Sequence, residues 1–208
     1  DIFPSGIVHL GGDEAPTEVW EKCPLCREAR TKTGMKDEQE QMRAFFAKTT
    51  VLLAKNGQTP QFWYEGNAGI YHPGETVYAW RQDQALQSIE KTKKAGLNLI
   101  MASNEYCYLD FPQIQGQRNW GWMKTTTLQK CYELDPAFGK PEKEAGHIRG
   151  VHAPVWAERL PDLDHLLYRA YPRACAIAEA GWSPMSVRSF FLITHPLPWY
   201  NLFRNSSS

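Results

Sequence analysis

Two adjacent carboxylates, Asp13 and Glu14, are the residues of this sequence best suited to acid–base chemistry. They follow His9-Leu-Gly-Gly12, which reads as the end of a short buried strand and a loop opened by glycine. A carboxyl group donates protons near neutral pH when its pKa is raised, and a neighbouring negative charge and partial burial both raise it. Acidic pairs also stabilise helix N-termini, which is the structural alternative. We take the pair as a candidate catalytic site.

Aromatic and polar residues recur at the end of nearly every expected strand. After the carboxylate pair they are Trp63/Glu65, Trp80/Arg81, Tyr108/Asp110 and Trp156/Glu158. One such strand end would be ordinary, but five in series favour a shared site at the carboxyl ends of parallel strands. Aromatic rings suit a sugar because pyranose C–H faces stack on them. The 8 tryptophans of the chain are also good core residues, so composition alone does not decide.

Strand and helix alternate along the chain, which predicts an α/β fold with parallel strands and crossover helices. The expected strands lie near the N-terminus and at 61–64, 76–80, 97–102 and 151–156, and the expected helices at 37–56, 83–95 and 163–180. Asp37 with Glu40 predicts a capping box and Gly57 a helix end. Pro172 should kink the last helix. Residues 111–146 are too long for a plain loop and are either functional or locally helical.

Composition restricts the class of protein. The 208 residues suffice for one well-buried domain, and Lys+Arg and Asp+Glu both number 23. We therefore expect no binding to nucleic acid or to an anionic membrane. No apolar run is long enough to cross a bilayer, and no leader is recognisable. The first residue is not Met, so the compartment stays open, with the periplasm and secretion among the possibilities.

The five cysteines predict neither a disulfide framework nor a metal site. They are odd in number and widely spread, apart from Cys23-Pro-Leu-Cys26. This pair could supply half of a tetrahedral zinc site, but no second pair follows, and the histidines lack ligand spacing. We expect no metal and no cofactor.

Six ordered motifs resemble glycoside hydrolase family 20, the β-N-acetylhexosaminidases. They are His9–Glu14 (HLGGDE), Trp63-Tyr-Glu65, Ala79-Trp-Arg81, Tyr106-Cys-Tyr-Leu-Asp110, Val155-Trp-Ala-Glu158, and Tyr171-Pro-Arg-Ala with Ala178–Trp182. The resemblance covers residues 3 to 184. It implies a (β/α)8 TIM barrel, of which this chain would supply about strands 4 to 8. It also implies hydrolysis of terminal β-linked GlcNAc or GalNAc with retention, in which the substrate's own acetamido oxygen is the nucleophile.

The resemblance also assigns roles to residues. Glu14 would be the general acid/base, Asp13 would orient the acetamido group, and Tyr108 would hydrogen-bond its oxygen. Three tryptophans would wall the pocket for the acetamido methyl group, two carboxylates would hold sugar hydroxyls, and one further tryptophan would stack on the sugar. In that order these are Trp63, Trp80 and Trp156; Asp110 and Glu158; and Trp122.

Three departures from the family pattern matter. Tyr64 stands where the family usually has Asp, and residues 189–208 are an atypical aromatic tail with a Ser run, beyond a catalytic portion at 1–188. The first three strands, with a sugar-binding Arg and a supporting His, have no counterpart. An inactive sugar-binding or structural remnant is therefore the alternative, and a relative releasing a disaccharide is another.

Because the strand at His9 would be an open edge, we expect association as a homodimer or with a complementing N-terminal fragment.

Overall fold

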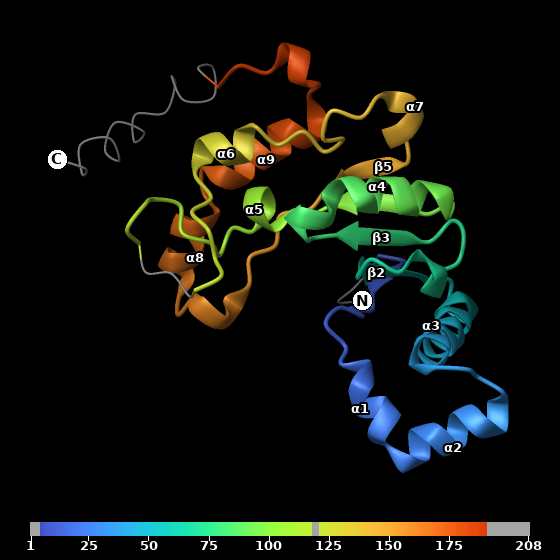
Figure 1. The fold of residues 1–208 in the computed structure, drawn as a ribbon. Helices are drawn as coiled ribbons and strands as arrows, with labels where there is room; N and C mark the ends of the chain where they lie inside the picture. The colour runs from blue at the N-terminus through green and yellow to red at the C-terminus, as the bar shows by residue number, and fades with distance from the viewer. Residues whose placement is uncertain (1–4, 118–120, 191–208) are drawn as a thin grey trace. The chain divides into compact units, whose positions relative to one another are not determined.

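A computed structural model describes residues 5–117 and 121–190 of the chain. It divides into two compact units, residues 1–100 with 140–149 and residues 101–139 with 150–208. The strands are β1 (Ile7–His9), β2 (Thr59–Tyr64), β3 (Thr76–Ala79), β4 (Asn98–Met101) and β5 (Ile148–Val151). They form one sheet in sequence order, and the intervening segments are largely helical (Figure 1). The predicted α/β fold with parallel strands is confirmed.

The first three strands run parallel in a defined register. Val8 of β1 lies opposite Pro60 of β2, and Trp63 of β2 lies opposite Tyr78 of β3. In the described sheet β1 lies at an edge, bordered by β2 as expected, and the side chain of Ile7 is exposed. An exposed edge strand of this kind is a site at which another strand can pair.

The helices of the first unit include one long helix whose ends follow the sequence prediction. They are α1 (Thr17–Lys22), α2 (Pro24–Thr33), α3 (Glu38–Lys55), α4 (Ala85–Lys94) and α7 (Glu142–Ala145), with short 3-10 turns η1 (Ala68–Ile70) and η2 (Gln82–Gln84). At the start of α3 the Asp37 carboxylate accepts a hydrogen bond from the backbone N–H of Glu40 at 2.8 Å. The Glu40 carboxylate in turn accepts a hydrogen bond from the backbone N–H of Lys36, one residue before the usual capping-box partner. Gly57, at φ 69°, follows the helix end.

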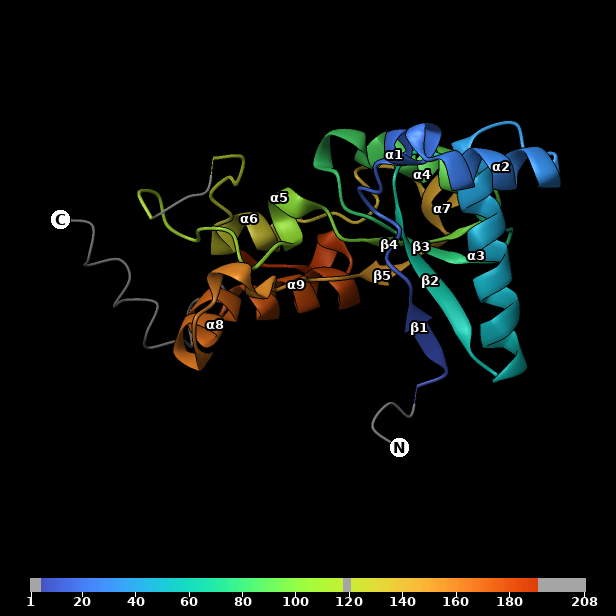
Figure 2. The same ribbon diagram turned by 90° about the horizontal axis from the view of Figure 1, so that it is seen from below.

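Strand β2 divides the first unit into a packed face and a face that carries candidate site residues. Phe62 and Tyr64 point to one side, where Phe62 packs on Phe46 of α3 with ring centroids 4.7 Å apart. Figure 2 shows α3 running alongside β2 on this side. Successive side chains of a strand point to opposite faces, so Trp63 faces the other way. It meets His9 and Tyr78 there, with ring centroids 5.1 and 5.6 Å away.

The second unit is built from short helices around an apolar cluster. Its elements are α5 (Asn104–Cys107), α6 (Leu128–Tyr132), α8 (Leu163–Ala170), α9 (Arg173–Trp182) and the 3-10 turns η3 (Ala157–Arg159) and η4 (Met185–Val187). Helices α6 and α9 pack side by side (Figure 1), burying Cys131, Leu134 and Ile177. Helices α6 and α7 both fall within residues 111–146, which confirms that this connection is locally helical.

Two element predictions are wrong in detail. The strand expected at 151–156 is β5, which ends at Val151. Its pairing is completed by hydrogen bonds from Leu99 N–H to His147 O and from His152 N–H to Met101 O, before Pro154, which has no N–H to donate. The helix expected at 163–180 is two helices, because Pro172 breaks it rather than kinking it. Of the predicted tail, residues 191–208 lie outside the described residues.

Candidate active site

The loop after β1 presents the carboxylate pair, and its glycines are required by geometry. Gly12 has φ 97°, and a Cβ added there would lie 2.6 Å from Cζ of Phe46 on α3. Hydrogen bonds from Leu10 N–H to Gln61 O (2.8 Å) and from Trp63 N–H to Gly11 O (2.9 Å) extend the pairing with β2 into the loop. The loop is thereby fixed at the carboxyl end of β1, where only glycine fits at position 12 without strain.

Glu14 itself has an unusual backbone conformation. Its φ is 48°, in the left-handed region that residues other than glycine rarely adopt. Such outliers cost about 1–3 kcal/mol and cluster at functional sites. The side chain is 67% exposed, with Oε1 3.8 Å from a guanidinium nitrogen of Arg81. Asp13 is half-buried. Within this chain the partial burial expected for the pair is therefore present at Asp13 and not at Glu14.

A second carboxylate, Glu65, ties the ends of β2 and β3 together. It accepts a hydrogen bond from Nε1 of Trp80 at 2.6 Å and one from Arg81 at 3.3 Å. The Arg81 guanidinium carbon also lies 4.1 Å from the centroid of the Trp80 ring, a cation–π distance. Arg81 thus links Glu14, Glu65 and Trp80. Glu65 and Arg81 belong to the strand-end series that favours a shared site, but the sequence predicts no individual role for either residue. Their position beside Trp63 and Trp80 was the available signal.

Both tryptophans predicted in the first unit are buried. Trp63 packs in the ring cluster with His9 and Tyr78, and the hydroxyl of Tyr78 donates to Oε1 of Gln61 at 2.5 Å. His9 Nδ1 accepts a hydrogen bond from the N–H of Gly11. These contacts fix the ring of Trp63 and the start of the carboxylate loop against each other.

Tyr64, which stands where the family pattern has Asp, is a core residue here. Its ring lies 6.1 Å from that of Tyr71, on the packed face of β2. Burial raises the pKa of its hydroxyl to about 12, and this hydroxyl has no hydrogen-bond partner among the described residues. A hydroxyl in this position cannot replace a carboxylate that supports a loop.

In the second unit Tyr108 and Asp110 are both buried, just after α5. The Asp110 carboxylate accepts a hydrogen bond from the backbone N–H of Trp156, but its Oδ1 has no partner among the described residues. Burial, and to a lesser extent the negative charge of Glu158, raises the pKa of Asp110 to about 6, while the positive Arg173 opposes the rise. A buried carboxylate oxygen that lacks a donor can accept a hydrogen bond from a substrate hydroxyl.

Four aromatic rings of the second unit form a row of edge-to-face contacts. Trp156 lies 6.1 Å from Tyr108, Tyr108 lies 5.5 Å from Phe111, and Phe111 lies 5.1 Å from Trp122. The two outer rings of this row, Trp122 and Trp156, are exposed. Exposed indoles beside a buried polar group are the combination used to stack and orient a sugar. Within the second unit the structure therefore brings together Tyr108, Asp110, Trp122 and Trp156, while Glu158 is exposed and acts on Asp110 through its charge.

Arg173, which lies in the motif Tyr171-Pro-Arg-Ala but has no role predicted from the sequence, holds this group in place. It is fully buried and donates hydrogen bonds to the carbonyl oxygens of Leu109 (2.5 Å), Thr126 (2.9 Å) and Arg169 (2.6 Å). The Leu109 carbonyl lies between Tyr108 and Asp110 in the chain, so Arg173 fixes the backbone that presents both. Burial lowers the pKa of Arg173 to about 10, so it remains charged at neutral pH.

Two features of the described residues bear on metal binding and on membrane insertion. In residues 5–117 and 121–190, no three His, Cys, Asp or Glu side chains are grouped as metal ligands. Over the same residues no helix has the length and apolar character needed to cross a membrane.

Comparison with known proteins identifies the family. The sequence model of the family described as "Glycosyl hydrolase family 20, catalytic domain" matches residues 1–185. A β-hexosaminidase of Akkermansia muciniphila is 93% identical over 190 residues, which are 91% of this chain and 38% of that protein. This chain therefore spans less than half the length of that relative.

Solved structures agree with the family match. The crystal structure of a β-N-acetylhexosaminidase superposes with a TM-score of 0.92 at 85% identity, covering all of this chain and 45% of that one. An exo-β-N-acetylglucosaminidase from Vibrio harveyi, 24% identical, gives a TM-score of 0.83 over 98% of this chain and 32% of its own length, which supports the fold alone. The five parallel strands are thus part of a TIM barrel, as the resemblance implied, and the chain belongs to glycoside hydrolase family 20.

Proposed function

We propose that the protein containing this chain is an exo-β-N-acetylhexosaminidase that removes terminal β-linked GlcNAc or GalNAc with retention. One observation carries the proposal. The carboxylate pair follows a barrel strand on a glycine loop where a Cβ at position 12 would lie 2.6 Å from the Phe46 ring, and Glu14 adopts a strained left-handed conformation there. The relatives extend beyond this chain, so the proposal concerns the whole protein.

The first step is an intramolecular attack of the substrate's acetamido oxygen on its anomeric carbon. Asp13 accepts a hydrogen bond from the acetamido N–H, and the Tyr108 hydroxyl donates one to the acetamido oxygen. That oxygen forms a bond to the anomeric carbon while the bond to the leaving oxygen breaks. Glu14 gives its proton to the leaving oxygen, and the sugar becomes an oxazolinium whose charge Asp13 balances. Holding the nucleophile in place in this way replaces a protein carboxylate nucleophile.

In the second step Glu14, now ionised, takes a proton from water. The water oxygen bonds to the anomeric carbon, and the bond to the acetamido oxygen breaks. Two displacements at one carbon retain its configuration. This role requires a carboxyl group that can exchange protons with both the leaving group and water.

Sugar recognition is proposed for the remaining predicted residues. Trp63, Trp80 and Trp156 enclose the acetamido methyl group, Asp110 and Glu158 accept hydrogen bonds from hydroxyls, and Trp122 stacks on a ring. The vacant acceptor of buried Asp110 and the edge-to-face aromatic row beside it support the assignment in the second unit. The contact of Trp80 with Glu65 and Arg81 supports it in the first.

The oligomeric state stays a prediction. The exposed edge of β1 supports pairing with a second copy or with a complementing N-terminal fragment. Light scattering with activity measured over a dilution series tests this. A fully active, monodisperse monomer of this chain at nanomolar concentration would contradict it. Complete inactivity of this chain with normal sugar binding would instead favour the sugar-binding remnant.

The experiment for the proposed function uses two p-nitrophenyl substrates on the whole protein. The β-N-acetylglucosaminide should be hydrolysed, with the β-anomer of the sugar released first in a proton NMR time course. The matching β-glucoside, which lacks the acetamido group, should not be hydrolysed measurably. Equal turnover of both substrates would exclude an acetamido nucleophile.

A further inference from the structure

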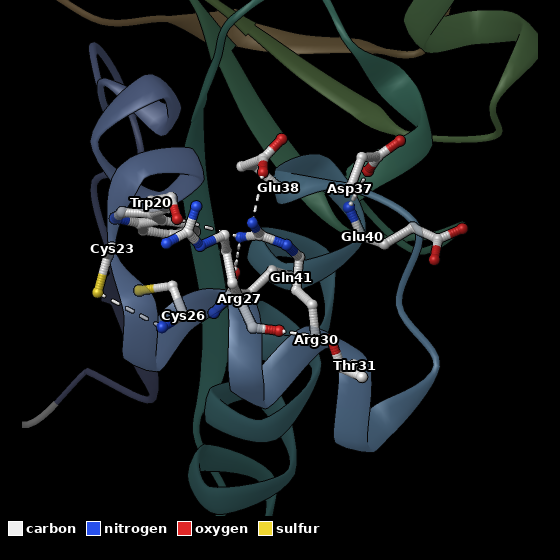
Figure 3. A network of polar contacts seen from close by, with 10 residues as sticks. All are labelled: Trp20, Cys23, Cys26, Arg27, Arg30, Thr31, Asp37, Glu38, Glu40 and Gln41. Carbon is white, nitrogen blue, oxygen red and sulfur yellow. Dashed lines mark hydrogen bonds and ion pairs between the residues drawn. The ribbon is translucent and has the colours of Figure 1, made fainter.

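The junction of α1 and α2 holds a pair of thiols that the proposed hydrolysis does not use. Cys23 is the N-cap of α2, a helix of 10 residues, and Cys26 lies in its first turn. Both side chains are partly exposed. The backbone N–H of Cys26 donates a hydrogen bond to the sulfur of Cys23 at 3.4 Å (Figure 3). In a helical turn, Cα atoms three residues apart are about 5 Å apart, within the range that a disulfide spans.

A buried arginine fixes the helix that carries the pair. Arg30 of α2 donates hydrogen bonds to the carbonyl oxygen of Trp20 on α1 (3.3 Å) and to Gln41 on α3 (2.8 Å). Its guanidinium also forms an ion pair with Glu38 of α3 at 2.8 Å. Figure 3 shows these partners converging on the Arg30 guanidinium, to the right of the two cysteines. Three helices are thereby tied at one point, so the start of α2 is held in a defined geometry.

The two thiols are not equivalent. The Cys26 thiol donates to the Cys23 sulfur, and this bond is the largest cause that lowers the pKa of Cys23, followed by the backbone N–H of Cys26. The N–H of Leu25 and the charge of Arg27 act in the same direction. The pKa of Cys26 is raised, chiefly because its proton is held by Cys23. Cys107 and Cys131 are buried, and burial raises the pKa of both.

We propose that Cys23 and Cys26 form a reversible dithiol–disulfide couple, with Cys23 as the attacking sulfur and Cys26 as the resolving one. The oxidant is a low-molecular-weight disulfide. The Cys23 thiolate attacks one of its sulfurs, which forms a mixed disulfide and releases one thiolate that takes up a proton. Cys26 then loses its proton, attacks the Cys23 sulfur and expels the second thiol. Two protein thiols are oxidised and one external disulfide is reduced to two thiols; an external dithiol reverses the reaction.

This geometry favours the couple over a metal site. Tetrahedral zinc needs four ligands, and within the described part of the chain no third His, Cys, Asp or Glu joins the pair. A helix N-cap cysteine with a partner three residues later is the arrangement in which a thiolate is activated and then resolved. Neither step involves Asp13 or Glu14, so the proposal stands apart from the proposed hydrolysis.

The test is redox titration with mass spectrometry on the whole protein. The protein is equilibrated with reduced and oxidised glutathione at neutral pH, alkylated and digested with trypsin. Lys22 and Arg27 flank the pair, so both cysteines fall in the single peptide Cys23–Arg27. We expect this peptide to become an internal disulfide as the share of oxidised glutathione rises, and dithiothreitol to restore two alkylated thiols. A peptide that stays fully alkylated in oxidised glutathione would overturn the proposal.

Two variants and a rate comparison assign the roles. Cys26→Ser should accumulate glutathione on Cys23, whereas Cys23→Ser should leave Cys26 alkylatable. In the unmodified protein Cys23 should react with an alkylating probe about tenfold faster than the exposed Cys175, as expected for an activated thiolate. This advantage should vanish in urea, where α2 is lost. Equal rates for Cys23 and Cys175 in the folded protein would refute an activated Cys23.

Discussion

Glu14 in the first unit and Asp110 in the second are both carboxylates that interact with an arginine, yet their surroundings are opposite. Glu14 stands on a strained loop, exposed, with Arg81 at 3.8 Å. Asp110 is buried beside Arg173, its pKa is raised to about 6, and one of its oxygens has no hydrogen-bond partner among the described residues. A proton-transferring group must reach leaving group and water, whereas a binding group gains from being desolvated in advance. The contrast matches the roles proposed for the two residues.

The largest expected effect is on Glu14. Glu14→Gln removes the proton donor while keeping shape, so turnover of an unactivated disaccharide should fall by about 10²–10⁴-fold. Sugar binding, followed by titration calorimetry, should be unchanged. Glu21→Gln on α1, an exposed site in the same stretch of chain, is the matched control and should keep full activity. A Glu14→Gln enzyme retaining more than half of the activity would show that the exposed carboxylate is not the acid.

Arg173 should be the position of greatest consequence for stability. Arg173→Leu leaves the carbonyl oxygens of Leu109 and Thr126 buried without their donors, which should cost about 2–4 kcal/mol of unfolding free energy. Urea denaturation measures this. Arg149→Leu, on the exposed face of β5, should change stability by less than about 0.5 kcal/mol. Similar losses at both positions would mean that the second unit does not depend on its buried arginine.

Asp110→Asn should separate binding from stability. The pKa of Asp110 is about 6 in the folded chain and about 3.9 in an unfolded one, so the folded state binds the proton more tightly. The wild type therefore loses stability as pH rises from about 4 to 6, and the loss is complete above that. The variant should lack this slope and be about 1–3 kcal/mol more stable than wild type at pH 7.5.

The two proteins should have similar stability near pH 3.5, while sugar affinity should fall in the variant. Thermal unfolding at several pH values gives the slope. If Asp110→Asn destabilised the protein at pH 7.5, the carboxylate would have to be stabilised in the folded state, and the contrast with Glu14 would be lost.

Gly12→Ala tests the loop that presents Glu14. The added Cβ would meet the Phe46 ring in a backbone conformation that favours glycine, so we expect a loss of about 1–2 kcal/mol with reduced turnover. Phe46→Leu added to this variant should restore part of the turnover by relieving the contact. Gly34→Ala, also at positive φ but with no atom within 4 Å of the new Cβ, should leave turnover unchanged. Equal turnover losses for both alanine variants would contradict a role for the close approach of α3.

Local signals predicted one part of this structure well. The capping pair at Asp37 and the stop at Gly57 define α3 because both act within one helical turn. The strand-end pattern also predicted that Asp13 and Glu14, Trp63 and Trp80 lie at or just beyond the carboxyl ends of β1, β2 and β3, where the structure has them. Local patterns could not predict contacts between residues far apart in the sequence. Arginine is usually found on the surface, but Arg173 is buried because it donates hydrogen bonds to carbonyl oxygens of residues 47 and 64 positions away. Likewise β5 starts earlier than its apolar run because its pairing with β4 decides the register.

Substrate assistance is the central claim, and inhibition by an N-acetylglucosamine thiazoline tests it most directly. The thiazoline is a stable mimic of the oxazolinium, and Asp13, Tyr108 and the tryptophans are proposed to fit that bicyclic shape better than they fit the substrate. Competitive inhibition of the whole protein should be at least about 10²-fold tighter than inhibition by free N-acetylglucosamine, and Asp13→Asn should weaken the thiazoline more than the sugar. A thiazoline that binds no better than N-acetylglucosamine would contradict the account and point to a carboxylate nucleophile.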